Sequence, residues 1–447
     1  MSWWTNSTAD DLRRRLGVLY AVSLLLIAGS VVALQHYLPL GESLAVPDKP
    51  SLVVLPFTNL SGDPEQEYFN DGMAAKLLHD LSKLSGLFVT DLNSAFFYKG
   101  RRMNAESVSQ ALGVRYLVKG SARKVEDRMV MEVQVADTTA TCYVWAECSV
   151  WTAEYDRPLQ DIFAVQEELA QKIAAFLDVT PTPEEHERWR RIPTNNLEAY
   201  DYFLRGRKLT RMGKTPELTA QAQQMVERAV GLDPQYASAY LLLGWLQWRQ
   251  WFSQWSHDPQ TLRQAFALAQ RASVLDDSLA DAHGLLAHAS LLEGRYDHAI
   301  SEGEKAVALG PNSAYASAIL GYVLIFAGRP EDALRPSEQA MRLDPHHPAD
   351  YLNPVGQAYW LMEQEEKAIA AYERVLDTDP VNLEALLGLT VIYSESNQEQ
   401  TAQAGVERIL AVDPNFSLQT ATKRWPPYKD QAVLARILTA LQKAGLK

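Results

Sequence analysis

A short motif recurs in the second half of the chain at a nearly constant spacing, and it limits the possible folds more than any other feature. Three of the six copies read aliphatic residue, aspartate, proline, and the others differ from this at one position. They stand at residues 232–234, 275–277, 309–311, 343–345, 378–380 and 412–414. Successive copies lie 43, 34, 34, 35 and 34 residues apart. A fixed period of roughly 20–50 residues indicates structural units that stack, because one such unit cannot bury its own apolar face.

The 34-residue step resembles the tetratricopeptide repeat, in which each unit is a pair of antiparallel helices. Positions inside the units agree with this resemblance, as in the unit with Gly321 on its first helix, Ala333 on its second and Pro345 after it. Small residues are needed where two helices cross closely, and proline ends the second helix. We therefore expect an all-α tetratricopeptide solenoid, with six helical pairs at 196–414 and a C-terminal helical cap at 415–447.

The repeats depart from the regular period in three places, and each departure predicts a local change in the structure. The 43-residue step predicts about nine extra residues between the helices of the second pair, around residues 250–259. In the first pair, residues 207–216 are expected to lengthen the corresponding turn. After Pro414 the register stops, and the tail with WPPYKD at 425–430 is expected to cover the end of the stack.

Four tryptophans in the second pair form the strongest candidate for a binding surface: Trp245, Trp248, Trp251 and Trp255. Their spacings of 3, 3 and 4 residues predict one aromatic stripe on a helix. Tryptophan is enriched at binding hot spots, so the stripe is a candidate partner-binding face. The alternative is that Trp245 and Trp248 fill the core between pairs while the other two cover the insertion.

A second hydrophobic signal stands near the N-terminus. Residues 17–38 carry no charge, and as a helix these 22 residues would span about 33 Å, which matches a bilayer core. Three arginines at 13–15 precede them, so the positive-inside rule predicts a cytoplasmic tail at 1–15, a single transmembrane anchor at 16–39 and everything later across the membrane. The alternative is a cleaved secretory signal, since residues 43–45 are Ser-Leu-Ala.

The region between anchor and repeats has a mixed pattern. After a spacer at 40–50, residues 51–177 are expected to form a small α/β domain with a mixed or antiparallel sheet, followed by a linker at 178–195. The last three expected strands would make an antiparallel meander, and Asn70 or Asp71 would cap the first helix. The expected strands are 52–57, 87–90, 116–124, 129–136 and 142–151, and the expected helices are 71–84, 105–112 and 159–177.

Three stretches of this region carry a specific resemblance. They are LVVLPFTNLSGDPEQEYFNDGM at 52–73, LGVRYLVKGSARK at 112–124 and YDRPLQDIFAVQEELAQKIA at 155–174. Together they resemble the TolB-like amino-terminal domain of certain bacterial adenylate cyclases and winged-helix transmembrane regulators, which typically continues into tetratricopeptide repeats. The resemblance implies a bacterial inner-membrane protein with periplasmic C-terminal domains. In that family the effector domain precedes the membrane helix, and because 15 residues leave no room for it here, we expect no enzyme.

Other motifs point away from cofactors, metals and nucleic acid. The net charge of −13 and the lack of a basic stripe disfavour nucleic acid as a partner. Residues 206–215 contain GKT, yet Lys208 stands where a phosphate loop needs glycine. We expect no catalytic, cofactor or metal residues, and we interpret the remaining candidates as a solvated turn, scattered histidines and buried small hydrophobes. These candidates are the acidic group Asp63, Glu65, Glu67 and Asp71, the histidines His283, His288 and His298, and the cysteines Cys142 and Cys148.

The sequence therefore predicts a membrane-anchored periplasmic scaffold that binds a peptide, protein or envelope component in its repeat groove. The alternative is the sensory half of a signalling system, which binds a small molecule and signals to a separate membrane or cytoplasmic protein. Homo-oligomerisation is left open in both cases.

Overall fold

The computed structural model describes residues 44–447, apart from residues 102–103, 140–148, 257, 348 and 423–424. Within this range Val46–Lys447 form one compact unit. The predicted tail at 1–15, the predicted anchor at 16–39 and both cysteines lie outside the described residues. Of the helices that the structure describes, none has the length and hydrophobicity that a membrane crossing requires.

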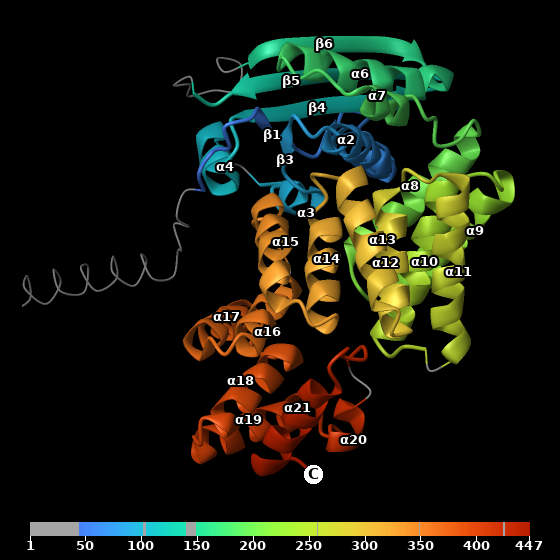
Figure 1. The fold of residues 1–447 in the computed structure, drawn as a ribbon. Coiled ribbons are helices and arrows are strands. Elements are labelled where there is room, and N and C mark those ends of the chain that lie inside the picture. Colours follow the sequence, from blue (N-terminus) through green and yellow to red (C-terminus); the bar gives the residue numbers. More distant parts are fainter. Residues whose placement is uncertain (1–43, 102–103, 140–148, 257, 348, 423–424) are drawn as a thin grey trace, which may run out of the picture. The chain divides into compact units, whose positions relative to one another are not determined.

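A mixed sheet forms the first part of this unit (Figure 1). Its strands are β1 (Ser51–Val54), β2 (Thr58–Asn59), β3 (Phe88–Val89), β4 (Tyr116–Val125), β5 (Arg128–Asp137) and β6 (Ser149–Pro158). The strand order is β3-β1-β4-β5-β6, and β2 pairs with β4. Strands β4, β5 and β6 are antiparallel, which confirms the predicted meander, whereas β1 runs parallel to both β3 and β4. The third strand of the meander spans 149–158 and not the predicted 142–151, of which 142–148 lie outside the described residues.

Alternation in β5 explains how the sheet builds its core. Met129, Met131 and Val133 are at most 1% exposed, while Glu132 and Gln134 between and after them remain half-buried. This is the two-residue period of a strand with one buried face. Helices α2 (Glu67–Ser82) and α6 (Ile162–Phe176) contact each other and supply the apolar side chains that cover this face.

In the α/β part some helix boundaries agree with the prediction and others differ from it. Helix α4 (Ala105–Leu112) ends at Gly113 as predicted, in a left-handed conformation with φ of 60° that suits glycine. Helix α2, by contrast, begins four residues before the expected Asp71, so neither Asn70 nor Asp71 caps it. Asn70 is buried inside the helix, and its Oδ1 accepts a hydrogen bond from the amide of Ala122 on β4 at 3.1 Å. A further helix, α3 (Leu92–Phe96), was not predicted.

The expected linker at 178–195 contains a helix. Thr182 and Glu185 form a capping box at the start of α7 (Pro183–Trp189). Trp189 is 4% exposed, and its indole N–H donates to the carbonyl of Asp80 on α2 at 2.6 Å. The segment therefore packs against the α/β domain rather than crossing open solvent, because its tryptophan finds both an apolar site and a hydrogen-bond acceptor there.

The repeats form an all-α array. Between residues 196 and 414, leaving aside residues 257 and 348, the described chain folds into six helical pairs, each closed by one of the recurring tripeptides. The pairs are α8 (Leu197–Met212) with α9 (Pro216–Leu232), α10 (Ala237–Phe252) with α11 (Pro259–Leu275), α12 (Ala280–Leu292) with α13 (Tyr296–Leu309), α14 (Ala314–Phe326) with α15 (Pro330–Leu343), α16 (Asn353–Leu361) with α17 (Glu365–Thr378), and α18 (Leu383–Glu395) with α19 (Glu399–Val412).

The extra residues of the first two pairs lie mainly in helices, not in turns. Helices α10 and α11 have 16 and 17 residues, compared with 13 and 14 in α12 and α13. Helices α8 and α9 have 16 and 17 residues as well. The turn expected at 207–216 is therefore wrong in length, because residues up to Met212 continue α8 and only residues 213–215 separate it from α9.

The tail after residue 414 contains α20 (Leu418–Ala421) and α21 (Gln431–Lys443). Helix α21 packs on α18, where Ser394 donates to the carbonyl of Ala440 at 2.8 Å. The segment 425–430 reaches further back along the array: the amide of Lys429 donates to the carbonyl of Phe326 on α14 at 2.9 Å. The tail thus covers part of the surface formed by the first helices of the pairs, in addition to the end of the stack.

Candidate functional site

Aromatic side chains on the first helices of successive pairs form a connected series. We call it the aromatic row, and it consists of Trp245, Trp248, His288, Tyr322, Phe326 and Tyr428. Neighbouring ring centroids in this order lie 5.5, 5.5, 5.5, 4.8 and 4.6 Å apart. Helices α10, α12 and α14 and the tail segment all contribute to it. The row exists because the repeat period places equivalent positions of these helices beside one another.

Exposure changes along the aromatic row. Trp245, Trp248, His288 and Tyr322 are half-buried, whereas Phe326 and Tyr428 are at most 2% exposed because the tail covers them. Trp248 also has an indole nitrogen that is buried without a hydrogen-bond partner among the described residues. Half-buried aromatic rings with an unused donor are suited to contact with a ligand, since a buried N–H without a partner is costly.

The four predicted tryptophans are only partly brought together. Ring contacts within the described chain join Trp245 and Trp248 to the aromatic row but include neither Trp251 nor Trp255. A step of three residues turns a helix by about 300°, so each step rotates the stripe by about 60° away from its starting face. Trp255 lies beyond the end of α10. The assignment of all four residues to partner binding stays a prediction.

Burial controls the charge of the histidine in the aromatic row. Its surroundings of Trp248 and Tyr322 disfavour a cation by desolvation, which lowers the pKa of His288 to about 4. The ring is therefore neutral near pH 7, and this allows it to stack on Tyr322 at an interplanar angle of 16°.

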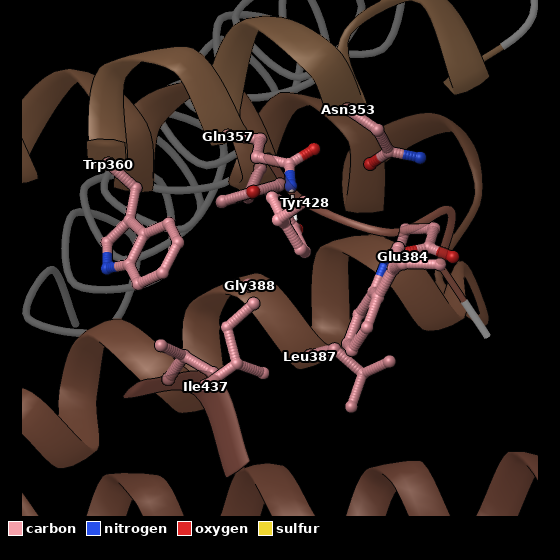
Figure 2. A pocket seen from close by; sticks show the side chains of 11 residues that line it. Asn353, Gln357, Trp360, Glu384, Leu387, Gly388, Tyr428 and Ile437 are labelled. Atoms are coloured by element: carbon pink, nitrogen blue, oxygen red, sulfur yellow. Dashed lines mark hydrogen bonds between the residues drawn. The ribbon is translucent and has the colours of Figure 1, made fainter. Parts of the chain in front are cut away.

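A cavity of about 40 Å³ adjoins the last member of the aromatic row, and we call it the end pocket (Figure 2). Helices α16, α17, α18 and α21 enclose it together with the tail segment. Its side chains come from residues far apart in the sequence: Asn353, Gln357, Trp360, Tyr372, Glu384, Leu387, Gly388, Val391, Trp425, Tyr428 and Ile437. Gln357, Glu384 and Trp425 are half-buried, so the end pocket can be reached from solvent.

Asn353 presents an unused acceptor in the end pocket. Its neighbour Asn382 caps α18 by accepting the amide of Ala385 at 3.1 Å on Oδ1. The same Oδ1 accepts from Asn353 Nδ2 at 3.0 Å, which fixes the amide orientation of Asn353. The other end of that amide, Oδ1, is buried without a hydrogen-bond partner among the described residues.

The remaining polar groups of the end pocket are held in place by aromatic partners. Glu384 Oε2 accepts the indole N–H of Trp425 at 2.8 Å, and Gln357 Nε2 donates to the hydroxyl of Tyr428. Burial raises the pKa of the Tyr428 phenol well above its usual range, so the ring stays neutral. The ring of Tyr372 fills the space beside Gly388, where an added Cβ would clash with Tyr372 Cζ.

This arrangement can bind a small group and hold it against aromatic surfaces. Sequence reasoning assigned the tail only to the cap and did not identify Asn353, Gln357 or Glu384 as site residues. The signal for the site was the pair of aromatic residues in WPPYKD, which are costly to expose and therefore pack on another surface.

The other candidates from the sequence have structural partners instead. Asp63 caps a 3-10 turn by accepting the amide of Glu65 at 2.9 Å, while Glu67 and Asp71 pair with Lys99 at 2.9 and 2.6 Å. His283 and His298 both approach Glu302, at 2.6 and 3.8 Å, and His298 also contacts Ser290, whereas His288 lies apart from them in the aromatic row. In the described part of the chain, no cluster of three or more His, Cys, Asp or Glu residues could hold a metal ion.

Comparison with known proteins agrees with the repeat architecture. A family model described as tetratricopeptide repeat matches residues 359–424. A protein of Rhizobium meliloti (strain 1021) named "Putative adenylate cyclase 3" is 40% identical over 255 residues, which are 57% of this chain and 42% of the relative. This chain therefore matches less than half of that relative's length. The helical pairs form a tetratricopeptide-like all-α solenoid, and the family model itself covers residues 359–424.

The solved structures to which this chain is similar include YrrB, described as a TPR protein with an unusual peptide-binding site. It is 20% identical, with a TM-score of 0.31, and the match covers 45% of this chain and 98% of YrrB. The type IV pilus biogenesis factor PilW is 19% identical with a TM-score of 0.37, and the match covers 46% and 88% of the two chains.

Proposed function

We propose that this protein is an interaction scaffold that binds a peptide or protein partner along the first helices of its repeats. The observation that carries the proposal is the aromatic row, which is half-buried from Trp245 to Tyr322 and leads into the end pocket. Aromatic residues dominate binding hot spots because they bury large areas while losing little conformational entropy. Tetratricopeptide repeats suit such a role, since stacking produces an extended surface.

We also propose where this scaffold acts. Residues 16–39 would anchor the chain in a bacterial inner membrane, with the tail at 1–15 in the cytoplasm and the later domains in the periplasm. Residues 51–177 would be a TolB-like domain. The uncharged run and the arginines before it support the anchor, and the three stretches at 52–73, 112–124 and 155–174 support the domain assignment. The proposed role is binding, without catalysis.

Partner capture in membranes tests this function. The full-length chain, and its Trp248→Ala and Trp255→Ala variants, would be crosslinked in cells of the source organism and recovered by an affinity tag. Trp248→Ala should reduce the recovered partner about tenfold or more, because it removes a central member of the row. Trp255→Ala tests the rest of the predicted tryptophan stripe: because Trp255 shares no ring contact with the row among the described residues, this variant should retain the partner if the row alone binds it.

Two results would oppose the proposal. If Trp248→Ala kept its fold by circular dichroism and still captured the partner in full, the aromatic row would not be the binding surface. If Trp255→Ala alone lost the partner, the surface would lie at the turn between α10 and α11 instead.

A second candidate function is the sensory half of a signalling system. The observation in its favour is the similarity to a protein named as an adenylate cyclase, of which only part is matched. The compact unit 46–447 would then bind a small molecule and change the state of a separate signalling protein. Thermal-shift screening of this unit against metabolites should give a reproducible stabilising hit for the sensory function and none for the scaffold.

A further inference from the structure

We propose that the end pocket binds an alkylammonium group, of the kind that a lysine side chain carries. This inference deepens the proposed function and rests on it, because the lysine would belong to the bound partner. It assigns a chemical preference to a pocket that the aromatic row only adjoins.

The hydrogen-bonding groups of the end pocket favour a donor as ligand. Asn353 is 9% exposed, and its Oδ1, which has no hydrogen-bond partner among the described residues, is an acceptor whose orientation is fixed by Asn382. Glu384 supplies a carboxylate on another wall, aligned by the indole N–H of Trp425. An ammonium group has three N–H donors and no acceptor, so it satisfies Asn353 without competing for the donors already in use. A buried acceptor without a partner is costly, and binding would remove that cost.

The walls of the end pocket favour a positive charge. Four aromatic rings line it, those of Trp360, Tyr372, Trp425 and Tyr428. Aromatic faces attract cations through their quadrupole, most strongly for tryptophan and in sites removed from water. Among the described residues, the guanidinium of Arg436 lies 4.4 Å from the Trp360 ring centroid, and its charge is balanced by two hydrogen bonds to Glu395 at 2.5 and 2.8 Å.

The size of the end pocket selects a small head group. Its 40 Å³ exceeds the roughly 10–15 Å³ that one water needs, but it is far below the roughly 300–1,000 Å³ of a site for a drug-sized ligand. An ammonium with the last carbons of its alkyl stem fits this range, and the stem would lie between the aromatic rings. Entry is through the half-buried side, past Gln357 and Glu384.

The test uses n-butylammonium as the probe and the full-length chain as the receptor, with saturation-transfer NMR as the readout. We expect transfer to n-butylammonium, none to the neutral n-butanol, and weaker transfer to tetramethylammonium, which has charge but no N–H donor. Equal transfer to n-butanol would overturn the proposal, and so would stronger transfer to tetramethylammonium, because the hydrogen bond to Asn353 would then contribute nothing.

Variants locate the binding to the end pocket. Glu384→Gln keeps an acceptor for Trp425 but removes the charge, so it should weaken n-butylammonium binding about tenfold or more. Glu373→Gln makes the same change on an exposed side chain of α17 and should bind like the wild type. Asn353→Leu should also weaken n-butylammonium binding. If Asn353→Leu does not fold, Glu384→Gln still tests the proposal. Unchanged binding by Glu384→Gln would overturn the proposal.

Two further measurements are needed. One decides whether the ammonium group belongs to a lysine side chain, and the other tests the end pocket independently of the proposed scaffold function. The capped tripeptide Gly-Lys-Gly should displace n-butylammonium, whereas the same peptide with norleucine in place of lysine should not. If the lysine peptide failed to displace n-butylammonium, the ligand would be a free amine and not a lysine side chain. Trp248→Ala should lose partner capture yet keep n-butylammonium binding. Partner capture that survives without any n-butylammonium binding would refute this inference while the scaffold function stands.

Discussion

At the scale of single residues, His288 is a titratable group placed between two aromatic rings. Trp248 and Tyr322 flank it, and the resulting desolvation lowers its pKa from 6.5 to about 4. The unfolded chain therefore binds a proton on this histidine at a higher pH than the folded chain does. Between pH 6.5 and 4 the unfolded state holds more protons, so this residue makes stability fall as the pH falls.

Replacing His288 by phenylalanine should flatten that dependence. The ring would still stack on Tyr322, but no proton could bind it. At pH 5 we expect His288→Phe to have a larger free energy of unfolding than the wild type, by on the order of 1 kcal/mol, and therefore to unfold at a higher urea concentration. The difference in the free energy of unfolding should be smaller at pH 7.5. Urea titrations at the two pH values measure the effect. If the free energy of unfolding changed between the two pH values by the same amount in the variant and in the wild type, His288 would not be buried in its neutral form.

Sequence reasoning could find some site residues and not others, for a physical reason. Trp245 and Trp248 were recognisable because tryptophan is itself a signal and their spacing is local. Asn353 was not recognisable, because its role depends on Asn382, which lies 29 residues later and caps α18, the first helix of the following pair. Asn382 also holds the side-chain amide of Asn353 in a fixed orientation, and this leaves the acceptor of Asn353 unused in the pocket. A role that depends on a pair of residues in different helices cannot be read from either residue alone.

At the scale of elements, α15 contains a local conflict. Pro336 stands inside this helix, where it cannot donate to the carbonyl of the preceding turn. Pro330 begins the same helix, where the missing N–H is not needed. The surrounding repeat tolerates the interior proline because the helix is held by its packing on α14.

Pro336→Ala should therefore stabilise the protein by about 1–2 kcal/mol, since it restores a hydrogen bond and removes a steric clash, partly offset by a freer unfolded chain. The matched change Pro330→Ala in the same helix should be neutral or slightly destabilising. Urea unfolding of the two variants beside the wild type gives the comparison. A Pro336→Ala variant less stable than the wild type would mean that the proline is required by a neighbouring element.

Element prediction succeeded where a period was present and failed where length changed. The recurring tripeptides fixed the six pairs, but the extra residues of the second pair were assigned to its turn. In the structure α10 and α11 are each three residues longer than α12 and α13. Adding nearly one turn to both partners keeps their contact surfaces matched, which an insertion count alone cannot reveal.

At the scale of the whole molecule, the α/β domain and the repeats share a hydrophobic core. That core includes side chains of the sheet together with Leu204, Val226 and Leu343 from the repeats. Figure 1 shows the ends of α14 and α15 next to α3 and β3. The amide of Asp91 donates to the carbonyl of Leu343 at 2.8 Å, and Asn93 and Ser94 donate to the carboxylate of Asp344. Within Val46–Lys447, the two parts are therefore expected to unfold together.

Asn312 is the side chain that tests this coupling most directly. It lies in a repeat turn, is 2% exposed, and accepts from the amide of Val89 at 3.3 Å. Its Nδ2 donates to the carbonyls of Ser82 and Leu84 at 3.1 and 2.9 Å. Asn415 occupies the same place after the last tripeptide but is exposed, so it is a matched control.

Asn312→Ala should destabilise the protein by about 2–3 kcal/mol, because three backbone groups of the α/β domain lose their buried partner. Hydrogen exchange should show weaker protection in β3 and at the end of α2, although the substitution lies in the repeats, while Asn415→Ala should leave both segments unchanged. If Asn312→Ala weakened protection only in α14 and its neighbours, the α/β domain would be stable without the repeats. Changes in the repeats could then not reach the α/β domain through this junction, and the sensory candidate would lose its route for transmission.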